Sequence, residues 1–499
     1  MSAIELLATE LISRILDHLF AASQRSRTCA LSLSSTSKTL RAKTVRWTFW
    51  DVSNLGRKGT SMWPESLWPH FRKVSLWDHL DALHRAASLE ILPSSASQAS
   101  LSQMPSLSQL VVYFRTTLSY SFLERIAALD SLVHLELHYI RLDGPIPASL
   151  SFRSLTSLVL RISGPLRTRR QLDINRTEET RNLMAFLGSL STKLIRLEIS
   201  GDLLVSQFGD IRWKCLKHFT ITDHPPLPSI PLTRLIGNMR RVVELQLHYT
   251  ADVPHHRLPP FRLDVGADSD VFSCLPELES CSFSNLDHED AVFRQLPPNL
   301  TALKLQALHD VPAGPYRSAR PQWYLGPLGD YPLSTKHAHA VLQALPPFGS
   351  LTTLSIAGAL HIPGRCFGPP VLESILERAP NLVSLELVHR PEYEQFNLID
   401  FSGYSELLFD WFRQLRRLAH LRICIVMEAM EFYPGPPVYA AYCLFEHVPT
   451  LRTVTYRFEG YWNTRHPYGL GRPVVDAWDR SLLALPRPAR VIRPGQLIM

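Results

Sequence analysis

A six-residue pattern, apolar-x-x-apolar-x-apolar, recurs along most of this 499-residue chain. Clear examples are LVHLEL from Leu132, LTALKL from Leu300 and LVSLEL from Leu382. A leucine-rich chain produces such hexamers by chance, so the residues that flank them have to support the interpretation. The hexamers begin at Leu107, Leu132, Leu155, Leu194, Leu216, Val242, Leu278, Leu300, Leu351, Leu382, Leu418 and Leu451.

Prolines and helical patterns precede several of these hexamers. Because the residue before a proline is restricted to extended geometry, a proline at this place ends a helix and precedes a strand. Five hexamers have a proline two residues upstream, namely Pro105, Pro276, Pro298, Pro380 and Pro449. Apolar residues three or four apart predict helices at residues 122–129, 183–190, 371–378, 406–415 and 439–445. One unit is therefore a helix, a short strand and a loop.

The spacing of the hexamers is typical of a known repeat. Their starts lie 22 to 51 residues apart, and the shorter separations fall in the range of roughly 20 to 29 residues that leucine-rich repeats use. Over residues 70–475 the chain resembles an irregular leucine-rich-repeat solenoid with insertions. The resemblance implies an α/β fold with a curved parallel sheet. The asparagine or cysteine that such repeats carry eight positions after the first leucine is replaced here, so we expect no regular asparagine ladder. The replacing residues are Ile140, Ser163, Asp202, His224, Leu308 and Arg390.

Residues 4–50 contain none of these hexamers and are predicted to form short helices, and an aromatic, strand-like segment follows at residues 47–52. Thr9 can cap a first helix, and Ser37 can cap a short one that runs through Leu40. The first helix carries a wide apolar stripe of Leu11, Ile12, Ile15, Leu16, Leu19 and Phe20. A helical motif this small cannot bury its apolar faces alone, so we expect it to lie against another surface.

This segment resembles an F-box. The opening motif of that family corresponds to Leu7-Ala8-Thr9-Glu10-Leu11, with Ala8 where the family has proline, and later motifs correspond to Thr36-Ser37-Lys38 and Trp47. An F-box before leucine-rich repeats is a common arrangement in fungal F-box proteins. The resemblance implies that the helices bind a Skp adaptor, and through it a cullin, while the repeats hold a protein substrate. The implied adaptor-binding residues are Leu7, Leu11, Ile12, Ile15, Leu16, Leu31 and Leu40.

The alternative is a leucine-rich-repeat scaffold without a ligase role, because helices at this place can also serve only to cap the first repeat. The expected organisation has four parts. A small helical F-box-like motif occupies residues 1–52, and a junction with degenerate first repeats occupies residues 53–106. The irregular solenoid covers residues 107–475, and a C-terminal cap and tail cover residues 476–499.

Charge and composition exclude several classes of partner. The formal charge of +7, from 52 basic and 45 acidic residues, is diluted over a long chain, so we expect no nucleic-acid binding. No stretch approaches the 18 or so apolar residues of a membrane helix. Glu5, Glu10 and Asp17 make the N-terminus unlike a signal peptide. The cysteines are odd in number and contain no CxxC pair. We therefore expect a cytoplasmic or nuclear protein with reduced thiols.

The sequence also gives no sign of catalysis. It contains no Gly-x-Ser-x-Gly elbow, Walker loop, dinucleotide-binding glycine motif or His-Glu-x-x-His motif. The pair His337 and His339 could offer imidazoles to a metal, but residues two apart on a helix diverge. We expect a binding protein with no cofactor and no metal.

The insertions in the C-terminal half concentrate aromatic residues. Long loops inside a repeat array are often functional, and Trp, Tyr and Arg are the residues that dominate binding energy at interfaces. We therefore predict a substrate surface formed by Trp323, Tyr324, Tyr433 and Trp462 with the strand residues Glu386 and Arg422 nearby. The alternative is that these rings pack against the repeats and fill loop cores.

Overall fold

The computed structural model divides the chain into two compact units, which are described separately. The first unit is Met1–Leu203 with Ile211–Leu216, and the second is Leu204–Asp210 with Lys217–Met499. The structure describes residues 11–12, 38–40, 51–55, 65–77, 101–113, 120–138, 142, 146, 150–161, 176–223, 225–226, 229–249, 261–263, 270–306, 308–309, 322–323, 335–357, 369–389, 405–430, 438–462 and 474–484.

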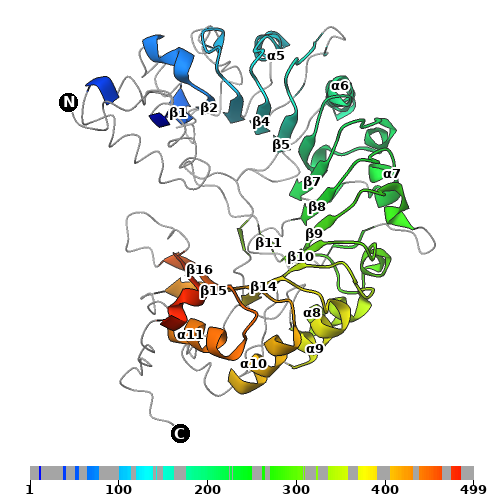
Figure 1. The fold of residues 1–499 in the computed structure, drawn as a ribbon. Helices are drawn as coiled ribbons and strands as arrows, with labels where there is room; N and C mark the ends of the chain where they lie inside the picture. Colours follow the sequence, from blue (N-terminus) through cyan, green and yellow to red (C-terminus); the bar gives the residue numbers. More distant parts are fainter. Residues whose placement is uncertain are drawn as a thin grey trace. The chain divides into compact units, whose positions relative to one another are not determined.

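The first unit contains a parallel sheet in which each strand pairs with the next along the chain. Its helices lie along one side of this sheet (Figure 1). The strands are β1 (Asp51–Leu55), β2 (Lys73–Trp77), β3 (Gln109–Tyr113), β4 (His134–His138), β5 (Ser157–Arg161) and β6 (Arg196–Ser200). The helical segments are η1 (Glu65–His70), α5 (Tyr120–Ala127), α6 (Arg176–Leu190) and η3 (Gly201–Leu203).

The second unit continues the same plan and ends on a reversal of strand direction. Its parallel strands are β7 (His218–Asp223), β8 (Glu244–Tyr249), β9 (Ser280–Ser284), β10 (Ala302–Gln306), β13 (Thr353–Ala357), β14 (Ser384–His389), β15 (His420–Met430) and β16 (Thr453–Trp462). The strand β17 (Val474–Asp479) pairs with β16 in the antiparallel direction. A separate antiparallel pair joins β11 (Leu308–His309) to β12 (Gln322–Trp323).

Helical segments connect the strands of the second unit. The α-helices are α7 (Leu232–Ile236), α8 (Thr335–Ala344), α9 (Pro369–Arg378), α10 (Ser405–Gln414) and α11 (Val438–His447). The shorter 3-10 segments are η4 (Ser206–Asp210), η5 (Val271–Cys274), η6 (Ala291–Gln295) and η8 (Arg480–Ala484). Each unit thus has the α/β architecture of leucine-rich repeats, in which short parallel strands alternate with helical segments in most of the described repeats.

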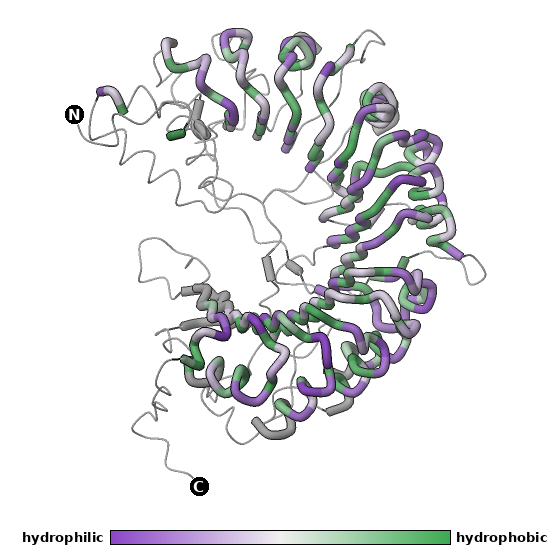
Figure 2. Tube along the Cα trace, in the orientation of Figure 1, coloured by the Kyte–Doolittle hydropathy of each residue, from purple (hydrophilic) through white to green (hydrophobic). Residues whose placement is uncertain are grey.

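The hexamers determine where the strands begin. Each of the twelve predicted hexamers gives a strand that starts two residues after its first apolar residue, from β3 after Leu107 to β16 after Leu451. The first, fourth and sixth residues of every hexamer are buried, with at most 5 % of their surface exposed. Figure 2 shows the resulting alternation of hydrophobic and hydrophilic residues along the strands. The predicted repeat is therefore confirmed.

A shared hydrogen bond links most of the described strands to the repeat before them. The amides of Val243 and Glu244 both donate to the carbonyl oxygen of Lys217, at 2.8 and 3.0 Å. The next repeat reproduces the arrangement, because the amides of Glu279 and Ser280 both donate to Val243. The same pairing recurs before β3, β4, β5, β6, β10, β13, β14, β15 and β16. It fixes the register between neighbouring strands.

The predicted helices are confirmed within two residues at nearly every end. The segments predicted at residues 371–378, 406–415 and 439–445 correspond to α9, α10 and α11. The helix predicted at 122–129 is α5, shifted by two residues, and the one predicted at 183–190 is the second half of the longer α6. At the N-terminus, residues 11–12 and 38–40 are helical, and the rest of that segment lies outside the described residues.

A side-chain hydrogen bond of the kind that an asparagine ladder uses is present at Asn285, just after β9. Its amide Nδ2 donates to the carbonyl oxygen of Tyr249 in the preceding repeat at 2.8 Å. Asn285 is buried and has a φ of 54°, a left-handed conformation that asparagine tolerates better than most residues. It follows the first apolar residue of its hexamer by seven positions rather than eight, so the expected place in the motif was wrong by one residue here.

Two substitutions of Asn285 should distinguish how much its side-chain hydrogen bond and its left-handed backbone conformation each contribute to stability. We expect Asn285→Gly to lower the free energy of unfolding by about 1 kcal/mol, because only the hydrogen bond is lost. We expect Asn285→Ala to lower it by about 2 kcal/mol, because alanine also resists the positive φ. Urea denaturation followed by circular dichroism measures both values, and equal stability of the alanine variant and the wild type would contradict the assignment.

Candidate functional site

The side chains opposite the buried leucines form a polar surface in each unit. Successive side chains of a strand point to opposite faces, so the third, fifth and seventh residues of each repeat lie on the face away from the core. Figure 1 shows the described helices of each unit on the other side of the sheet. We call the surface formed by these third, fifth and seventh residues the polar sheet face.

In the first unit, this face carries a carboxylate held between two histidines. The ring Nε2 of His138 lies 2.6 Å from Glu136 Oε1, and the ring of His134 lies 3.8 Å from Oε2 of the same carboxylate. Burial alone would raise the pKa of Glu136. The nearby ring of His134, the hydrogen bond from His138 and the charges of His138 and Arg161 outweigh burial and hold the pKa of Glu136 well below its ordinary value of 4.5.

The neighbouring pair of Arg161 and Glu198 is almost enclosed. The guanidinium Nε donates to Glu198 Oε1 at 2.7 Å, and the Nη2 group donates to the same oxygen. The two side chains are only 12 and 11 % exposed. Removal of one partner would leave a largely buried charge unpaired, which costs several kcal/mol, on the order of 3 to 5. This pair is therefore a structural part of the face.

In the second unit, β7 and β8 repeat the histidine–carboxylate arrangement in a more open form. The Nδ1 of His218 lies 2.8 Å from Glu244 Oε2, and the amide of Gln246 donates to the other oxygen of that carboxylate. Burial would raise the pKa of Glu244, but the hydrogen bonds from His218 and Gln246 and the charges of His218 and Lys304 lower it overall. Glu244 is therefore ionised at neutral pH.

Further along the same unit, the face carries opposite charges side by side. The hydroxyl of Ser355 donates to Glu386 Oε2 at 2.9 Å, and Arg422 Nη1 lies 3.4 Å from Glu386 Oε1. The side chain of Arg422 is 53 % exposed, whereas that of Glu386 is 18 % exposed. His420 and Thr453 form the next hydrogen bond, at 2.8 Å. The arginine is thus the member of this cluster that solvent reaches most easily.

The chemistry of this face is that of recognition by hydrogen bonds and charge. Its carboxylates are already engaged by histidine, arginine, serine or glutamine, and the pKa values of Glu136 and Glu244 are lowered. Within the described part of the chain, no group of three His, Cys, Asp or Glu side chains is arranged to hold a metal ion. The Nδ1 atom of His339 forms a hydrogen bond with the Ser374 hydroxyl at 3.1 Å.

Among the described helices, none has the length and apolar character needed to cross a membrane.

The sequence-predicted substrate residues fall into two groups. The structure brings Glu386 and Arg422 into contact, because they are register partners in β14 and β15. Trp323 lies in β12, and Trp462 is the last residue of β16, where it pairs with Met430. Tyr324 and Tyr433 lie outside the described residues. A common substrate surface for these residues stays a prediction.

The predicted adaptor-binding residues are described at three positions. Leu11 is 46 % exposed, while Ile12 and Leu40 are each 3 % exposed. The side chain of Leu11 is thus in contact with solvent, whereas Ile12 and Leu40 pack within the chain. The remaining predicted residues, Leu7, Ile15, Leu16 and Leu31, lie outside the described residues.

Sequence reasoning missed the histidines of the face. The segment His134-Leu135-Glu136-Leu137-His138 alternates polar and apolar residues, and this alternation predicts that its three polar side chains share one face. The pattern alone does not predict that both rings turn toward the carboxylate. Several polar residues at the fifth hexamer position are buried rather than exposed, namely Glu198, Thr220 and Ser355.

No protein-family model matches this chain, and no curated protein matches it. Solved structures give weak likenesses. The leucine-rich repeat domain of the type III effector XopL is 16 % identical over 60 % of this chain and 96 % of that one, with a TM-score of 0.28. Toll from the Drosophila Toll–Spatzle complex is 13 % identical over 78 % of this chain, with a TM-score of 0.32. TLR13 from its complex with ssRNA13 is 14 % identical over 80 %, with a TM-score of 0.28.

This chain spans 44 % of the Toll chain and 56 % of the TLR13 chain. At such low TM-scores these likenesses carry no inference about function. The assignment to the leucine-rich-repeat architecture therefore rests on the hexamers, the parallel register and the shared hydrogen bonds described above.

The low pKa of Glu136 predicts a pH-dependent contribution to stability. A carboxylate whose pKa is lowered in the folded state stabilises the protein fully above its unfolded pKa, near 4.5, and loses this effect as the pH falls. We expect Glu136→Gln to lower the free energy of unfolding by about 2 kcal/mol at pH 7. Its difference from the wild type should shrink below pH 4.5.

Urea denaturation at a series of pH values measures this difference. The matched control is Glu124→Gln, because Glu124 is an exposed glutamate on α5 of the same unit. A deficit in Glu136→Gln that stays constant from neutral to acidic pH would show that the loss does not arise from the charged carboxylate.

Proposed function

We propose that this chain is a non-catalytic recognition protein whose repeats bind a protein partner through the polar sheet face. The contact between Glu386 and Arg422 carries the proposal, since it sets opposite charges from adjacent repeats on one surface with Arg422 largely exposed. A face with both signs of charge and many hydrogen-bonding groups suits a protein surface better than a single small ligand.

Within this role, we propose that the chain is the substrate-recognition subunit of a Skp–cullin–F-box ubiquitin ligase. The resemblance of residues 7–11, 36–38 and 47 to F-box motifs supports the proposal. The exposure of Leu11 adds to this support, because an exposed leucine on a small helical motif is suited to pack in the groove of a partner. On this proposal, Leu11 contacts the Skp adaptor and the repeats hold the substrate.

The alternative function is a leucine-rich-repeat scaffold whose N-terminal helices only cap the first repeat. The burial of Ile12 and Leu40 favours this alternative, since capping helices bury their apolar side chains within the chain itself. The two functions differ in what they require of Leu11. A cap tolerates a polar side chain at an exposed position, whereas an adaptor contact does not.

A substitution at Leu11 distinguishes these functions. We expect Leu11→Asp to abolish co-purification of the full chain with a co-expressed Skp adaptor, because a charge would be buried without a partner in the interface. Leu11→Met is the matched control and should retain binding, since it keeps an apolar side chain of similar volume. Equal yields of adaptor with both variants, with unchanged melting temperature, would favour the scaffold.

Charge reversal on the polar sheet face tests the recognition role separately. We expect Lys304→Glu with Arg422→Glu to weaken partner capture by a factor of about 30, which corresponds to roughly 2 kcal/mol at a hot spot. Arg240→Glu with Arg241→Glu is the control, because it makes the same charge change at exposed residues just before β8. Quantitative mass spectrometry of proteins retained by the tagged chains measures the effect. Equal retention by both double variants would contradict a role for this face.

A further inference from the structure

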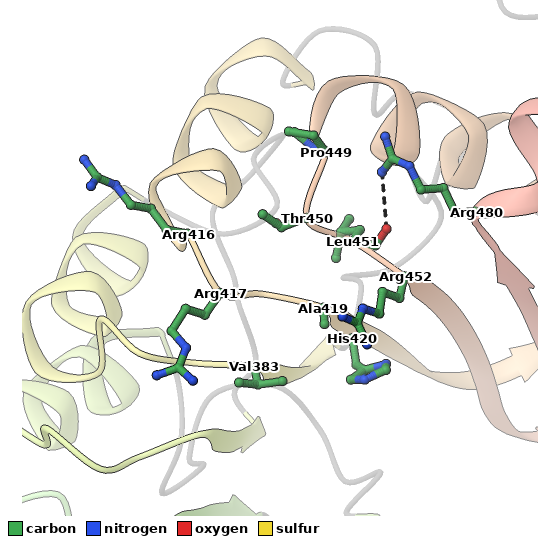
Figure 3. A pocket seen from close by; sticks show the side chains of 10 residues that line it. All are labelled: Val383, Arg416, Arg417, Ala419, His420, Pro449, Thr450, Leu451, Arg452 and Arg480. Atoms are coloured by element: carbon green, nitrogen blue, oxygen red, sulfur yellow. Dashed lines mark hydrogen bonds between the residues drawn. The ribbon is translucent and has the colours of Figure 1, made fainter.

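A second feature lies at the edge of the sheet where β14, β15 and β16 begin. It is an open pocket of about 630 Å³, drawn in Figure 3. Four arginines and one histidine line it, together with a small apolar wall. The lining residues are Val383, Arg416, Arg417, Ala419, His420, Pro449, Thr450, Leu451, Arg452 and Arg480.

The topology brings these arginines together from three separate segments. Arg416 and Arg417 lie in the loop between α10 and β15, and Arg452 lies in the loop between α11 and β16. Arg480 follows β17, whose antiparallel pairing with β16 returns the chain to the edge where β16 begins. The amide of Arg480 donates to the carbonyl oxygen of Arg452 at 3.2 Å, which joins two of the segments directly.

Only some of the arginines in this region form hydrogen bonds with carbonyl groups at a helix end. The guanidinium Nη1 of Arg480 donates to the carbonyl oxygens of Val448 and Leu451, each at 3.3 Å, and Arg413 donates to the carbonyl oxygen of His447 at 2.6 Å. These arginines satisfy carbonyl groups near the C-terminus of α11, as basic residues commonly do.

Arg416, Arg417 and Arg452 have no such role. Within the part of the chain that the structure describes, their side chains form no ion pair or hydrogen bond, and all three are exposed. The pocket lining contains no carboxylate. Three exposed arginines therefore line one pocket with neither an acidic nor a carbonyl partner, and Figure 3 shows that Arg416 points away from Arg417 and Arg452.

We infer that this pocket binds a phosphate monoester. A monoester carries close to two negative charges at neutral pH, and its oxygens match the forked donors of several arginines better than a single carboxylate does. The volume exceeds what one phosphate needs, and the accessible apolar side chains of Val383 and Pro449 can contact the carbon atoms that bear the phosphate. A phosphorylated side chain of a protein and a free small phosphate ester share this chemistry. The inference does not depend on the proposed ligase role.

Direct binding of defined probes to the full chain tests the inference. The first probe is a fluorescein-labelled peptide of glycine and alanine with one central phosphoserine, measured by fluorescence polarisation at low salt. Its unphosphorylated form is the negative control, and phenyl phosphate and adenosine monophosphate serve as competitors. We expect binding of the phosphopeptide to be at least tenfold tighter than that of the unphosphorylated form, and to weaken as salt screens the charges.

The matching variants are Arg417→Glu with Arg452→Glu for the pocket and Arg240→Glu with Arg241→Glu as the control. Arg240 and Arg241 occupy the same place before β8 that Arg416 and Arg417 occupy before β15, so the control makes an equal charge change on an equivalent loop. We expect the pocket variant to lose at least tenfold in affinity and the control to retain it. Thermal denaturation should show that both variants remain folded. A double variant with Arg417→Gln and Arg452→Gln removes the same two positive charges without adding negative ones.

Displacement by both small esters at similar concentrations would show that the phosphate alone is recognised. Displacement only by unlabelled phosphopeptide would show that a protein side chain is the source, and either result supports the inference. The inference is overturned if the wild type does not distinguish the two peptides, or if the pocket variants bind as well as the wild type. It is also overturned if a single-stranded oligonucleotide binds the wild type and displaces the phosphopeptide while the monoesters do not.

Discussion

The hydrogen bond that two successive amides share with one carbonyl oxygen of the preceding strand controls the arrangement of each unit. Val243 and Glu244 donate to Lys217, and Glu279 and Ser280 donate in turn to Val243. A repeat cannot make this bond alone, and it cannot bury the first, fourth and sixth residues of its hexamer alone either. Stacking satisfies both requirements in a single register. Equivalent side chains of successive repeats therefore form rows, and both the polar sheet face and the arginine pocket depend on these rows.

Much of this fold can be predicted from the sequence because the buried residues of each hexamer cannot be polar. The beginning of every strand from β3 to β10 and from β13 to β16 follows from its hexamer. β2 lies in the region predicted to hold degenerate first repeats, and its segment Phe-x-x-Val-x-Leu from Phe71 fits the apolar pattern although it was not among the twelve hexamers. β17 was missed because an antiparallel strand at the end of a sheet has no following repeat and needs no hexamer. Asn285 shows a similar limit, since its place in the motif depends on where the backbone turns left-handed.

The candidate surfaces were less predictable for a different reason. Glu386 and Arg422 were predicted near the same aromatic surface, and they contact each other because both occupy the fifth hexamer position and are register partners. The enclosure of Glu136 by His134 and His138 depends on side-chain rotamers, which no spacing encodes. The arginine pocket depends on residues outside the hexamers. Arg416 and Arg452 precede their strands, and Arg480 reaches the pocket only because β17 reverses direction. The positive charge of +7 is modest for the whole chain, so composition gave no indication of a local concentration.

The polar sheet face and the pocket differ in how their charges are compensated, and this difference decides what each can bind. On the face, Glu136, Glu244 and Glu386 already have histidine or arginine neighbours. A partner there must replace existing hydrogen bonds, so it gains specificity from correct geometry more than it gains affinity from charge. At the pocket, Arg416, Arg417 and Arg452 have no partner among the described side chains, so an anion forms new bonds without breaking old ones. The polar sheet face is thus suited to distinguish between protein partners. The arginine pocket, at the edge of the sheet, is suited to bind a single doubly charged group.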